Sequence, residues 1–387
     1  MQTNQIYKRR HFIKQTAAMT LLTSMPNSLK SLNFDAEATK IPTKGYAAFA
    51  TDGILKPYDF DRREVGVDDV QIEILYCGVC HSDIHTVRSE WKPETYPLVP
   101  GHELAGIVIK VGENVTKFKV GDQAGVGYMV DSCGDCASCK EGHEQYCDKH
   151  DTTFTYGSPD KHLGGVTQGG YSKTVVVKEH FVIKIPKSMD LKTAAPILCA
   201  GVTTFSPILN WDIKKDMVIG VAGIGGLGHM AIKLAVAKGA DVVAFTTSPT
   251  KIGDILRFGA KEVIIVDDIH KLARYEHKLD YMISTIPAQY NIDAYLSLVK
   301  RNATFTQVGI GAKPLVLNMG AFTHSRVNFI GSLIGGIAET QAVIDFCALH
   351  HIAPEIELIS IKDINEAHNN VVDKKARYRY VIDMTTL

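Results

Sequence analysis

The sequence predicts a two-domain α/β protein, with a partly open β-barrel first and a doubly wound parallel sheet second. The chain has 387 residues, a length that suits two domains better than one. From Gly45 onward, short strand-like runs separated by glycine turns precede any long helical pattern, which is typical of a small barrel. Later, Gly223 to Gly228 form a GxGxxG motif between an apolar run and a helical pattern, as in a dinucleotide-binding domain.

The composition excludes several classes of partner. About 45% of the residues are hydrophobic and 22% are charged, which is ordinary for a globular protein. The formal net charge is zero, so the basic stripe of a nucleic-acid-binding protein is not indicated. No apolar run approaches the roughly 20 residues that span a bilayer. We therefore expect neither nucleic acid nor a membrane as a partner.

Residues 1–40 are predicted to be an export signal rather than part of the fold. Paired arginines, Arg9 and Arg10, are followed by Phe12 and Lys14, then by a mildly apolar stretch and a small-x-small site at residues 36–38. This pattern resembles a twin-arginine (Tat) signal, which predicts a periplasmic protein. The alternative is an exposed basic tail on a cytoplasmic protein.

The first domain is expected to cover residues 41–198, with residues 338–387 returning to it. Val70 to Ile74 alternate between apolar and polar residues, as in a half-buried strand. The runs at 104–112 and 120–124 continue in the same style, with glycines at their ends. A helix, residues 355–361 and a last strand near residues 378–382 are expected in the returning segment.

Three separated side chains in this sequence have the donor types of a zinc site. They are Cys80, His102 and Cys199. Two thiolates and one imidazole leave one position of a tetrahedral zinc open, as a catalytic zinc requires. Glu103 follows His102 directly and is either a neighbour of the ligands, a transient fourth ligand, or a buried carboxylate paired elsewhere.

Four further cysteines occur at tight spacing on one loop. Cys133, Cys136, Cys139 and Cys147 are separated by two, two and seven residues. Such spacing favours a closed structural zinc site, with iron–sulfur ligation and disulfides as the alternatives. The two remaining cysteines, Cys77 and Cys347, are expected to be small buried hydrophobic residues.

The second domain, residues 199–337, is predicted to bind a dinucleotide. The apolar strand at 217–222 leads into the glycine motif, and a helix is expected from His229 to Lys238. Gly223 permits the tight turn, Gly225 lets the backbone approach the pyrophosphate, and Gly228 allows close helix–strand packing. The remaining expected contacts are Gly226 and Leu227 of the motif, Thr203 near Cys199, and Thr285 and Val308 at later strand ends.

The end of the strand at 241–246 indicates which dinucleotide is bound. NAD-binding domains usually carry an acidic residue there, which holds the ribose hydroxyls. This chain instead has Thr247, Ser248 and Lys251, and no carboxylate that would repel a 2′-phosphate. The sequence therefore predicts NADP.

The Gly101-His102-Glu103 motif, the run Cys77-Gly78-Val79-Cys80-His81-Ser82-Asp83 and the four-cysteine loop together resemble the zinc-dependent medium-chain alcohol dehydrogenases. The branch that includes the cinnamyl alcohol dehydrogenases is the most similar. The resemblance extends from about Lys44 to near the C-terminus. It implies a GroES-like first domain, one catalytic and one structural Zn²⁺, and hydride transfer between NADP(H) and a primary alcohol or aldehyde.

The resemblance also implies roles for individual residues. Asp83 would hydrogen-bond the imidazole of His102. Ser82 and His85, the latter expected near the surface, would carry the proton of the alcohol. His81 would lie near the cofactor phosphates, and Trp91 would form an aromatic wall of the substrate pocket.

Further expectations concern assembly and specificity. The strand at 327–334 would pair with its twin in a homodimer. Some relatives that act on aromatic alcohols carry a phenylalanine near Leu333, so strict cinnamyl specificity is not expected here. The rival hypotheses are a polyol dehydrogenase and a zinc- and nucleotide-binding scaffold without turnover.

Overall fold

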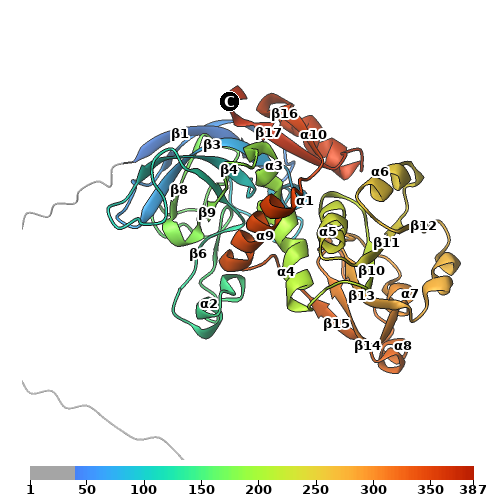
Figure 1. Cartoon of the computed structure of the whole chain (residues 1–387). Coiled ribbons are helices and arrows are strands. Elements are labelled where there is room, and N and C mark those ends of the chain that lie inside the picture. Colours follow the sequence, from blue (N-terminus) through green and yellow to red (C-terminus); the bar gives the residue numbers. More distant parts are fainter. Residues whose placement is uncertain (1–39) are drawn as a thin grey trace, which may run out of the picture. The chain divides into compact units, whose positions relative to one another are not determined.

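The computed structural model describes residues 40–387. The twin arginines and the cleavage site of the predicted export signal lie outside the described residues. Figure 1 shows one set of strands coloured blue to green, joined by the red C-terminal strands, and a second set coloured yellow to orange. None of the helices within residues 40–387 combines the length and the apolar character needed to span a bilayer.

The first sheet is built mainly from the N-terminal half of the described chain. Its strands are β3 (Asp69–Gly78), β4 (Leu104–Val111), β5 (Gln123–Val126), β8 (Thr174–Lys178), β9 (Ile183–Lys184), β16 (Ile356–Ser360) and β17 (Arg379–Asp383). Their spatial order is β16-β17-β3-β4-β5-β9, and β8 pairs with β3. Two antiparallel pairs accompany this sheet, β1 (Ile41–Ala48) with β2 (Leu55–Arg62) and β6 (Met129–Asp131) with β7 (Thr153–Phe154).

Strand β3 is central to this sheet because it pairs with β4, β8 and β17. Val70, Ile72 and Ile74 alternate along it and are buried, whereas Glu73 between them is exposed. This period of two places one face of the strand in the core. The antiparallel pairing of β17 with β3 sets Val381 opposite Gly78, so the last strand begins beside the predicted metal site.

The second sheet is parallel. Its strands are β10 (Val218–Ala222), β11 (Asp241–Thr246), β12 (Glu262–Ile265), β13 (Leu279–Ser284), β14 (Val299–Gln307) and β15 (Asn328–Gly331). The spatial order is β12-β11-β10-β13-β14-β15, which is the order of a doubly wound dinucleotide-binding sheet. In such a sheet the ligand binds at the carboxyl ends of the strands, where the order reverses between β10 and β13.

Both faces of this sheet are buried, which explains the continuous apolar runs of its strands. Val242 and Ala244 of β11 pack into one core cluster, and Val243 and Phe245 of the same strand pack into another. The predicted fold class, a GroES-like domain with a doubly wound dinucleotide-binding domain, is confirmed.

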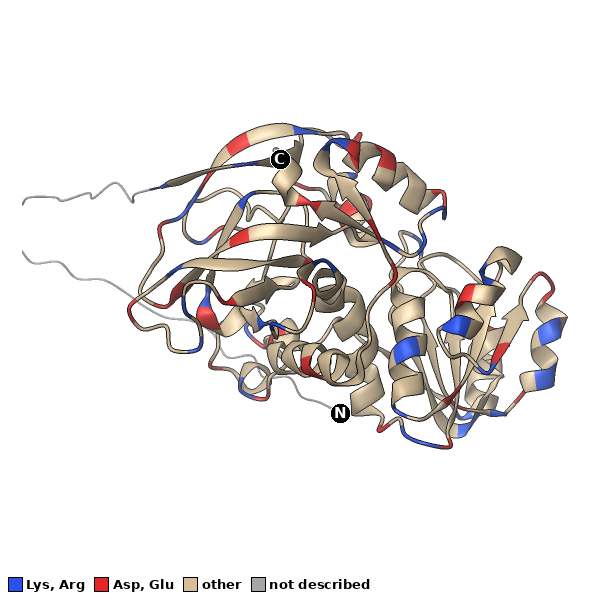
Figure 2. Ribbon diagram, turned by 45° about the horizontal axis from the view of Figure 1, so that its top comes forward, with Lys and Arg blue, Asp and Glu red and all other residues tan. Residues whose placement is uncertain are grey.

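Helices connect and cover these sheets. They are α1 (His81–Val87), α2 (Ala137–Lys140), α3 (Leu191–Pro196), α4 (Val202–Asn210), α5 (Gly226–Ala237), α6 (Ile252–Arg257), α7 (Ile292–Leu296), α8 (Met319–Ser325), α9 (Ile337–His350) and α10 (Ile364–Val372). Helix α5 begins at Gly226 rather than at His229, because the last glycines of the motif already form its first turn. Figure 2 shows acidic and basic residues interspersed along the ribbon.

Candidate metal centres and nucleotide site

The predicted zinc ligands come from three segments, two that lead into helices and one that leads into a strand. Cys80 precedes α1 directly, and its backbone N–H donates to Asp83 Oδ2 at 2.9 Å, which fixes the first turn of that helix. His102 and Glu103 immediately precede β4. Cys199 lies in a π-helical turn, Ile197–Gly201, between α3 and α4. Such turns are frequent at functional sites because they redirect a side chain.

The donor atoms of Cys80, His102, Glu103 and Cys199 all lie within 4.8 Å of one another, and all four residues are buried. His102 Nε2 lies 3.1 Å from Cys199 Sγ. Two thiols and an imidazole are donors that Zn²⁺ prefers, and a carboxylate is a further one. The structure therefore brings together the four residues that the sequence singled out.

The charges at this centre fit a cation. A hydrogen bond from the Cys199 thiol holds the pKa of Cys80 well below its usual range, against the effect of burial, and the Arg379 charge acts in the same direction. The same bond, together with burial, raises the pKa of Cys199. Cys80 thus favours the thiolate form and Cys199 the thiol form, and binding of zinc requires the second thiol to ionise as well.

Glu103 supplies the second indication that a cation belongs here. Both of its carboxylate oxygens are buried without a hydrogen-bond partner, and the closest cation is Arg379, with Nη2 at 3.4 Å from Oε1. Burial raises the pKa of Glu103 to about 8, with the Arg379 charge opposing this shift. Orphaned buried oxygens are costly in a protein unless a ligand or ion satisfies them.

Asp83 organises the imidazole of His102. Its carboxylate is fully buried and accepts from His102 Nδ1 at 2.9 Å, from Gly101 N at 3.1 Å and from the Tyr171 hydroxyl at 3.2 Å. With Nδ1 directed at Asp83, Nε2 faces the sulfur of Cys199 and is the nitrogen that would bind a metal. This arrangement orients a metal-binding histidine and fixes its tautomer.

The predicted proton path begins next to Cys80. Ser82 Oγ lies 3.6 Å from Cys80 Sγ. His85, one turn further along α1, stacks between the rings of His81 and Trp91, each with its centroid 4.8 Å away. Nδ1 of His85 pairs with the carboxylate of Glu90, whereas Nε2 of His85 and Nε1 of Trp91 are buried without partners.

The environment of His85 differs from the expectation in one respect. The residue is only 7% exposed, so it is not at the surface. Glu90, whose side chain is 35% exposed, connects it to solvent. Glu90 was not singled out from the sequence, although a carboxylate just after a helix that carries a proposed proton carrier is a recognisable signal.

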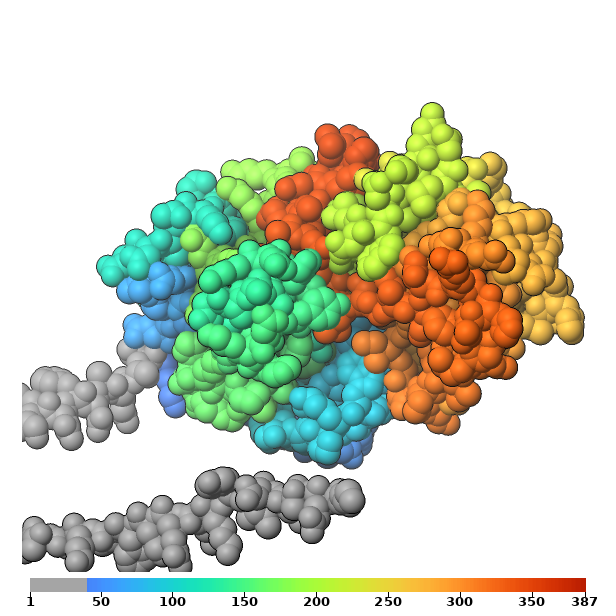
Figure 3. All heavy atoms as spheres, turned by 90° about the horizontal axis from the view of Figure 1, so that it is seen from below, coloured from blue at the N-terminus to red at the C-terminus, as the bar shows by residue number. Residues whose placement is uncertain are grey.

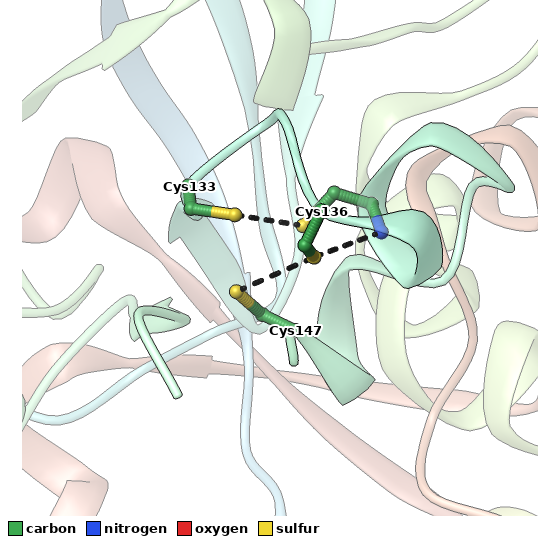
Figure 4. A group of neighbouring side chains, drawn as sticks. Cys133, Cys136 and Cys147 are labelled. Atoms are coloured by element: carbon green, nitrogen blue, oxygen red, sulfur yellow. Dashed lines mark hydrogen bonds between the residues drawn. The ribbon is translucent and has the colours of Figure 1, made fainter. Parts of the chain in front are cut away.

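The four-cysteine loop forms a second centre. The donor atoms of Cys133, Cys136, Cys139 and Cys147 lie within 4.8 Å of one another. All eight cysteines of the chain are free thiols, so no disulfide competes with metal binding. Figure 4 shows the sulfurs of Cys133, Cys136 and Cys147 directed toward one another, and Figure 3 shows this segment, coloured green, at the molecular surface.

Short helical turns hold the four sulfurs in place. Cys136 caps α2, where its sulfur accepts from the N–H of Cys139 at 3.5 Å and from the N–H of Asp148 at 3.4 Å. These contacts fix the position of a sulfur that would bind zinc.

The glycine motif has the geometry of a phosphate-binding turn. Gly223 has φ of +83°, which favours glycine, and its carbonyl accepts from Thr285 Oγ1 at 2.5 Å. A Cβ at Gly228 would lie 2.1 Å from the Gly223 carbonyl oxygen, so helix and turn pack too closely for a side chain. A Cβ at Gly225 would meet nothing within 4 Å, which leaves the backbone open to a ligand.

The other predicted nucleotide contacts surround this turn. Thr285 and Val308 follow β13 and β14 at their carboxyl ends. Lys251 is buried, and its Nζ donates to the carbonyl of Ile224 in the glycine turn at 2.7 Å. Just beyond β11, Thr247 is exposed and Ser248 is half-buried. Thr203 is buried in α4, and Leu227 is half-buried in the first turn of α5.

Arg379 of β17 is a functional candidate that sequence reasoning missed. Its Nη1 donates to the carbonyl of Val79 at 2.9 Å, and a Cβ on Gly226 would lie 2.9 Å from its guanidinium carbon. The guanidinium therefore spans from the metal centre to the glycine motif. An arginine within an otherwise apolar, buried strand is a signal that could have identified it.

Comparison with known proteins agrees with this geometry. A family model described as the alcohol dehydrogenase GroES-like domain matches residues 66–187, and one described as zinc-binding dehydrogenase matches residues 226–348. The aldehyde reductase YahK of Escherichia coli is 46% identical over 349 residues, covering 89% of this chain and 99% of that protein. The NADP-dependent alcohol dehydrogenase C 1 of Mycolicibacterium smegmatis is 44% identical, covering 88% and 98%.

A solved structure shows the same architecture. The cinnamyl alcohol dehydrogenase of Helicobacter pylori, complexed with NADP(H), superposes with a TM-score of 0.85 at 46% identity. The match covers 90% of this chain and 99% of that one. The resemblance inferred from the sequence motifs is confirmed by these matches.

Proposed function

The chain belongs to the zinc-dependent medium-chain alcohol dehydrogenases, in the branch of the cinnamyl alcohol dehydrogenases, and we propose that it interconverts primary alcohols and aldehydes with NADP(H). When bound, zinc supplies a Lewis acid that polarises the substrate oxygen, and NADP(H) accepts or donates the hydride. Cys80, His102 and Cys199 would hold the catalytic zinc, with Glu103 beside it. Cys133, Cys136, Cys139 and Cys147 would hold a structural zinc.

The side chains of α1 would handle the proton. Ser82 Oγ, next to the Cys80 sulfur, is placed to take the proton that the alcohol loses. His85 would hold a proton at Nε2, since its Nδ1 is engaged by Glu90. Trp91, which packs on His85, excludes water from that side of the ring.

The single observation that carries this proposal is the convergence of three buried zinc donors, Cys80, His102 and Cys199, beside the glycine motif, with the Glu103 carboxylate next to them. The Cys80 thiol has a lowered pKa there, and the Glu103 oxygens have no hydrogen-bond partner. A structural zinc site would be closed by four protein ligands of this kind, as the four-cysteine loop would be. A site of two thiols and one imidazole leaves room for a small oxygen ligand.

Steady-state kinetics on the mature protein would test the function. Zinc should be counted per chain, and rates should be compared with NADPH and NADH over a panel of aldehydes that includes benzaldehyde. We expect NADPH oxidation that depends on the aldehyde and a clear preference for NADPH. Turnover confined to polyols would favour a polyol dehydrogenase, and two bound zinc ions without turnover would indicate a scaffold.

We propose in addition that the protein forms a homodimer through β15. This strand is at one edge of the parallel sheet, and Asn328 to Gly331 are exposed or half-buried. An edge strand offers unpaired N–H and C=O groups to a second copy of itself. Sedimentation analysis would test this, and a monomer at micromolar concentration would contradict it.

We also propose that residues 1–40 direct export to the periplasm, on the strength of the Arg9-Arg10 pattern. Replacing both arginines by lysine should retain the protein in the cytoplasm. Cell fractionation with and without this double substitution gives the answer. An unchanged distribution would favour the cytoplasmic alternative.

A further inference from the structure

A cluster of basic side chains lies beyond the carboxyl end of β11, and part of it comes from a distant segment. Lys251 ends the short turn that follows β11, and Arg377 immediately precedes Tyr378 and β17. Nη2 of Arg377 donates to Thr250 Oγ1 at 2.9 Å. The C-terminal segment thus contacts the loop that the sequence analysis assigned to the cofactor.

The cations in this cluster lack anionic partners. Among residues 40–387, neither Lys251 nor Arg377 forms an ion pair with a carboxylate. Nη1 of Arg377 is buried without a hydrogen-bond partner. Asp254, the carboxylate nearby, is occupied by the Tyr378 hydroxyl at 2.9 Å and by Arg257 at 2.9 Å.

The electrostatics of Lys251 reflect this excess of positive charge. Burial, together with the charges of Arg377 and Lys374, lowers the pKa of Lys251 to about 8, against the opposing effect of Asp254. Its Nζ also lies 5.1 Å from the centre of the Tyr378 ring. Bringing like charges together costs free energy that an anion between them would offset.

The position of the cluster identifies the anion. In a dinucleotide-binding sheet, the adenosine ribose lies at the end of the second strand, where NADP-binding domains commonly place an arginine for the 2′-phosphate. The loop after β11 contains no arginine from Thr246 to Lys251. A guanidinium is nevertheless present there, because Arg377 reaches the loop from the segment before β17.

We infer that Arg377 supplies the guanidinium of the 2′-phosphate site and that this residue, with Lys251, selects NADP over NAD. This inference rests on the proposed function. The backbone of Arg377 is held in place from the other side, since its N–H donates to Glu357 Oε1 of β16 at 2.8 Å. The phosphate would therefore be bound jointly by the nucleotide loop and by a segment anchored to the first sheet.

Equilibrium binding of cofactor fragments tests this without relying on turnover. Calorimetry on the zinc-loaded protein would compare 2′,5′-ADP, which carries the 2′-phosphate, with 5′-AMP, which lacks it. Arg377→Gln should weaken 2′,5′-ADP binding by about 10- to 100-fold, as expected for loss of a charge-assisted hydrogen bond. Binding of 5′-AMP should change by less than about two-fold, which also shows that the site remains folded.

Two further variants sharpen the test. Arg377→Lys keeps the charge and should recover part of the lost 2′,5′-ADP affinity, although it cannot reproduce the planar fork of a guanidinium. Arg257→Gln removes a neighbouring cation that is already paired with Asp254, and it should leave the preference for 2′,5′-ADP unchanged. Inorganic phosphate should compete only weakly, because it lacks the adenosine contacts.

Several results would overturn the inference. If wild-type protein prefers 2′,5′-ADP and Arg377→Gln keeps that preference within two-fold, Arg377 is not part of the site, while NADP binding stands. If wild-type protein shows no preference for 2′,5′-ADP over 5′-AMP, the choice of NADP fails together with the inference. If inorganic phosphate competes as well as 2′,5′-ADP does, the cluster binds free anions and the assignment to the cofactor is wrong.

Discussion

The carboxylate of Asp83 accepts a hydrogen bond from Nδ1 of His102 at 2.9 Å, inside a site where neither residue is exposed to solvent. Asp83 also receives the backbone N–H of Cys80 and of Gly101 and the hydroxyl of Tyr171. One side chain thus positions two of the proposed zinc ligands, Cys80 through the backbone and His102 through its ring.

Replacing Asp83 by Asn should weaken zinc binding at this centre. An amide has one oxygen and one NH₂ group, so one of the N–H donors that now face the carboxylate would face another donor. We expect about 10- to 100-fold lower zinc affinity and a loss of about 1–3 kcal/mol of stability. Competition with a chelator and thermal unfolding would measure these two effects.

The matched control for Asp83→Asn is Tyr171→Phe. It removes one donor to the same carboxylate but keeps the hydrogen bonds that Asp83 accepts from the His102 ring and from the Cys80 backbone. It should cost about 1 kcal/mol of stability and change zinc affinity by only a few fold. Equal zinc affinities for wild-type protein and Asp83→Asn would show that Asp83 does not orient His102.

The two metal centres should be separable by zinc counting. Cys199→Ser should remove the catalytic zinc and abolish turnover, because a serine hydroxyl is a poor zinc ligand. Cys136→Ser should remove the other zinc and lower the thermal stability of the lobe, since metal binding contributes folding free energy there. Metal analysis by mass spectrometry after desalting gives the counts.

Cys347→Ala is the control for both cysteine variants, because Cys347 is buried in α9 and belongs to neither centre. It should leave both zinc ions in place. Full activity in Cys199→Ser with one zinc lost would contradict the assignment of the catalytic centre.

The proposed relay predicts a role for Glu90. Its carboxylate accepts a hydrogen bond from Nδ1 of His85, and Glu90→Gln should weaken this hydrogen bond. We expect kcat to fall by about 10-fold, which is less than the fall usually caused by removing the proton carrier itself. The KM for the aldehyde should stay within two-fold.

Glu94→Gln provides a comparison from the same loop, since Glu94 pairs with Lys92 and makes no contact with His85. Its kcat should match that of the wild type. Identical kcat values for wild-type protein and Glu90→Gln would remove Glu90 from the proton path.

The parts of the site that could be predicted are those encoded by local patterns. Cys80 follows an alternating strand, and Gly223 follows an apolar one, so spacing and context together indicate what each position does. The second strand, Asp241–Thr246, was also predicted with its observed bounds, because it is an apolar run bounded by turn residues. The cysteine spacing likewise needed no knowledge of tertiary structure.

The parts that were missed depend on contacts between distant segments. Arg379 reaches the metal centre only because β17 pairs with β3, and Arg377 reaches the cofactor loop from the same strand end. No periodicity near either arginine specifies those partners. His85 was expected near the surface because a lone histidine usually is, and its burial results from packing by Trp91 and His81.

The last prediction concerns His229, which is buried in α5 and uses both ring nitrogens. Nδ1 donates to the Gly225 carbonyl at 3.2 Å, and Nε2 accepts the N–H of Glu355 at 3.2 Å. A second proton would occupy the acceptor and place a charge in the core beside Lys233 and Arg379. Burial, with those two charges, lowers the pKa of His229 to about 3.

Since an unfolded histidine titrates near 6.5, the unfolded chain binds more protons than the folded one between about pH 3 and 6.5. The contribution of His229 to stability is therefore complete above pH 6.5 and is lost as the pH falls through that window. When the pH is lowered from 7.5 to 5, the free energy of unfolding of the wild-type protein should fall by about 2 kcal/mol more than that of His229→Gln. Denaturant unfolding across this pH range would measure this difference. Any effect of metal release is common to both proteins and therefore cancels.

His270→Gln, at an exposed imidazole, serves as the control. Parallel stability curves for the wild type and His229→Gln would show that the buried imidazole is protonated as readily in the folded state as in the unfolded one.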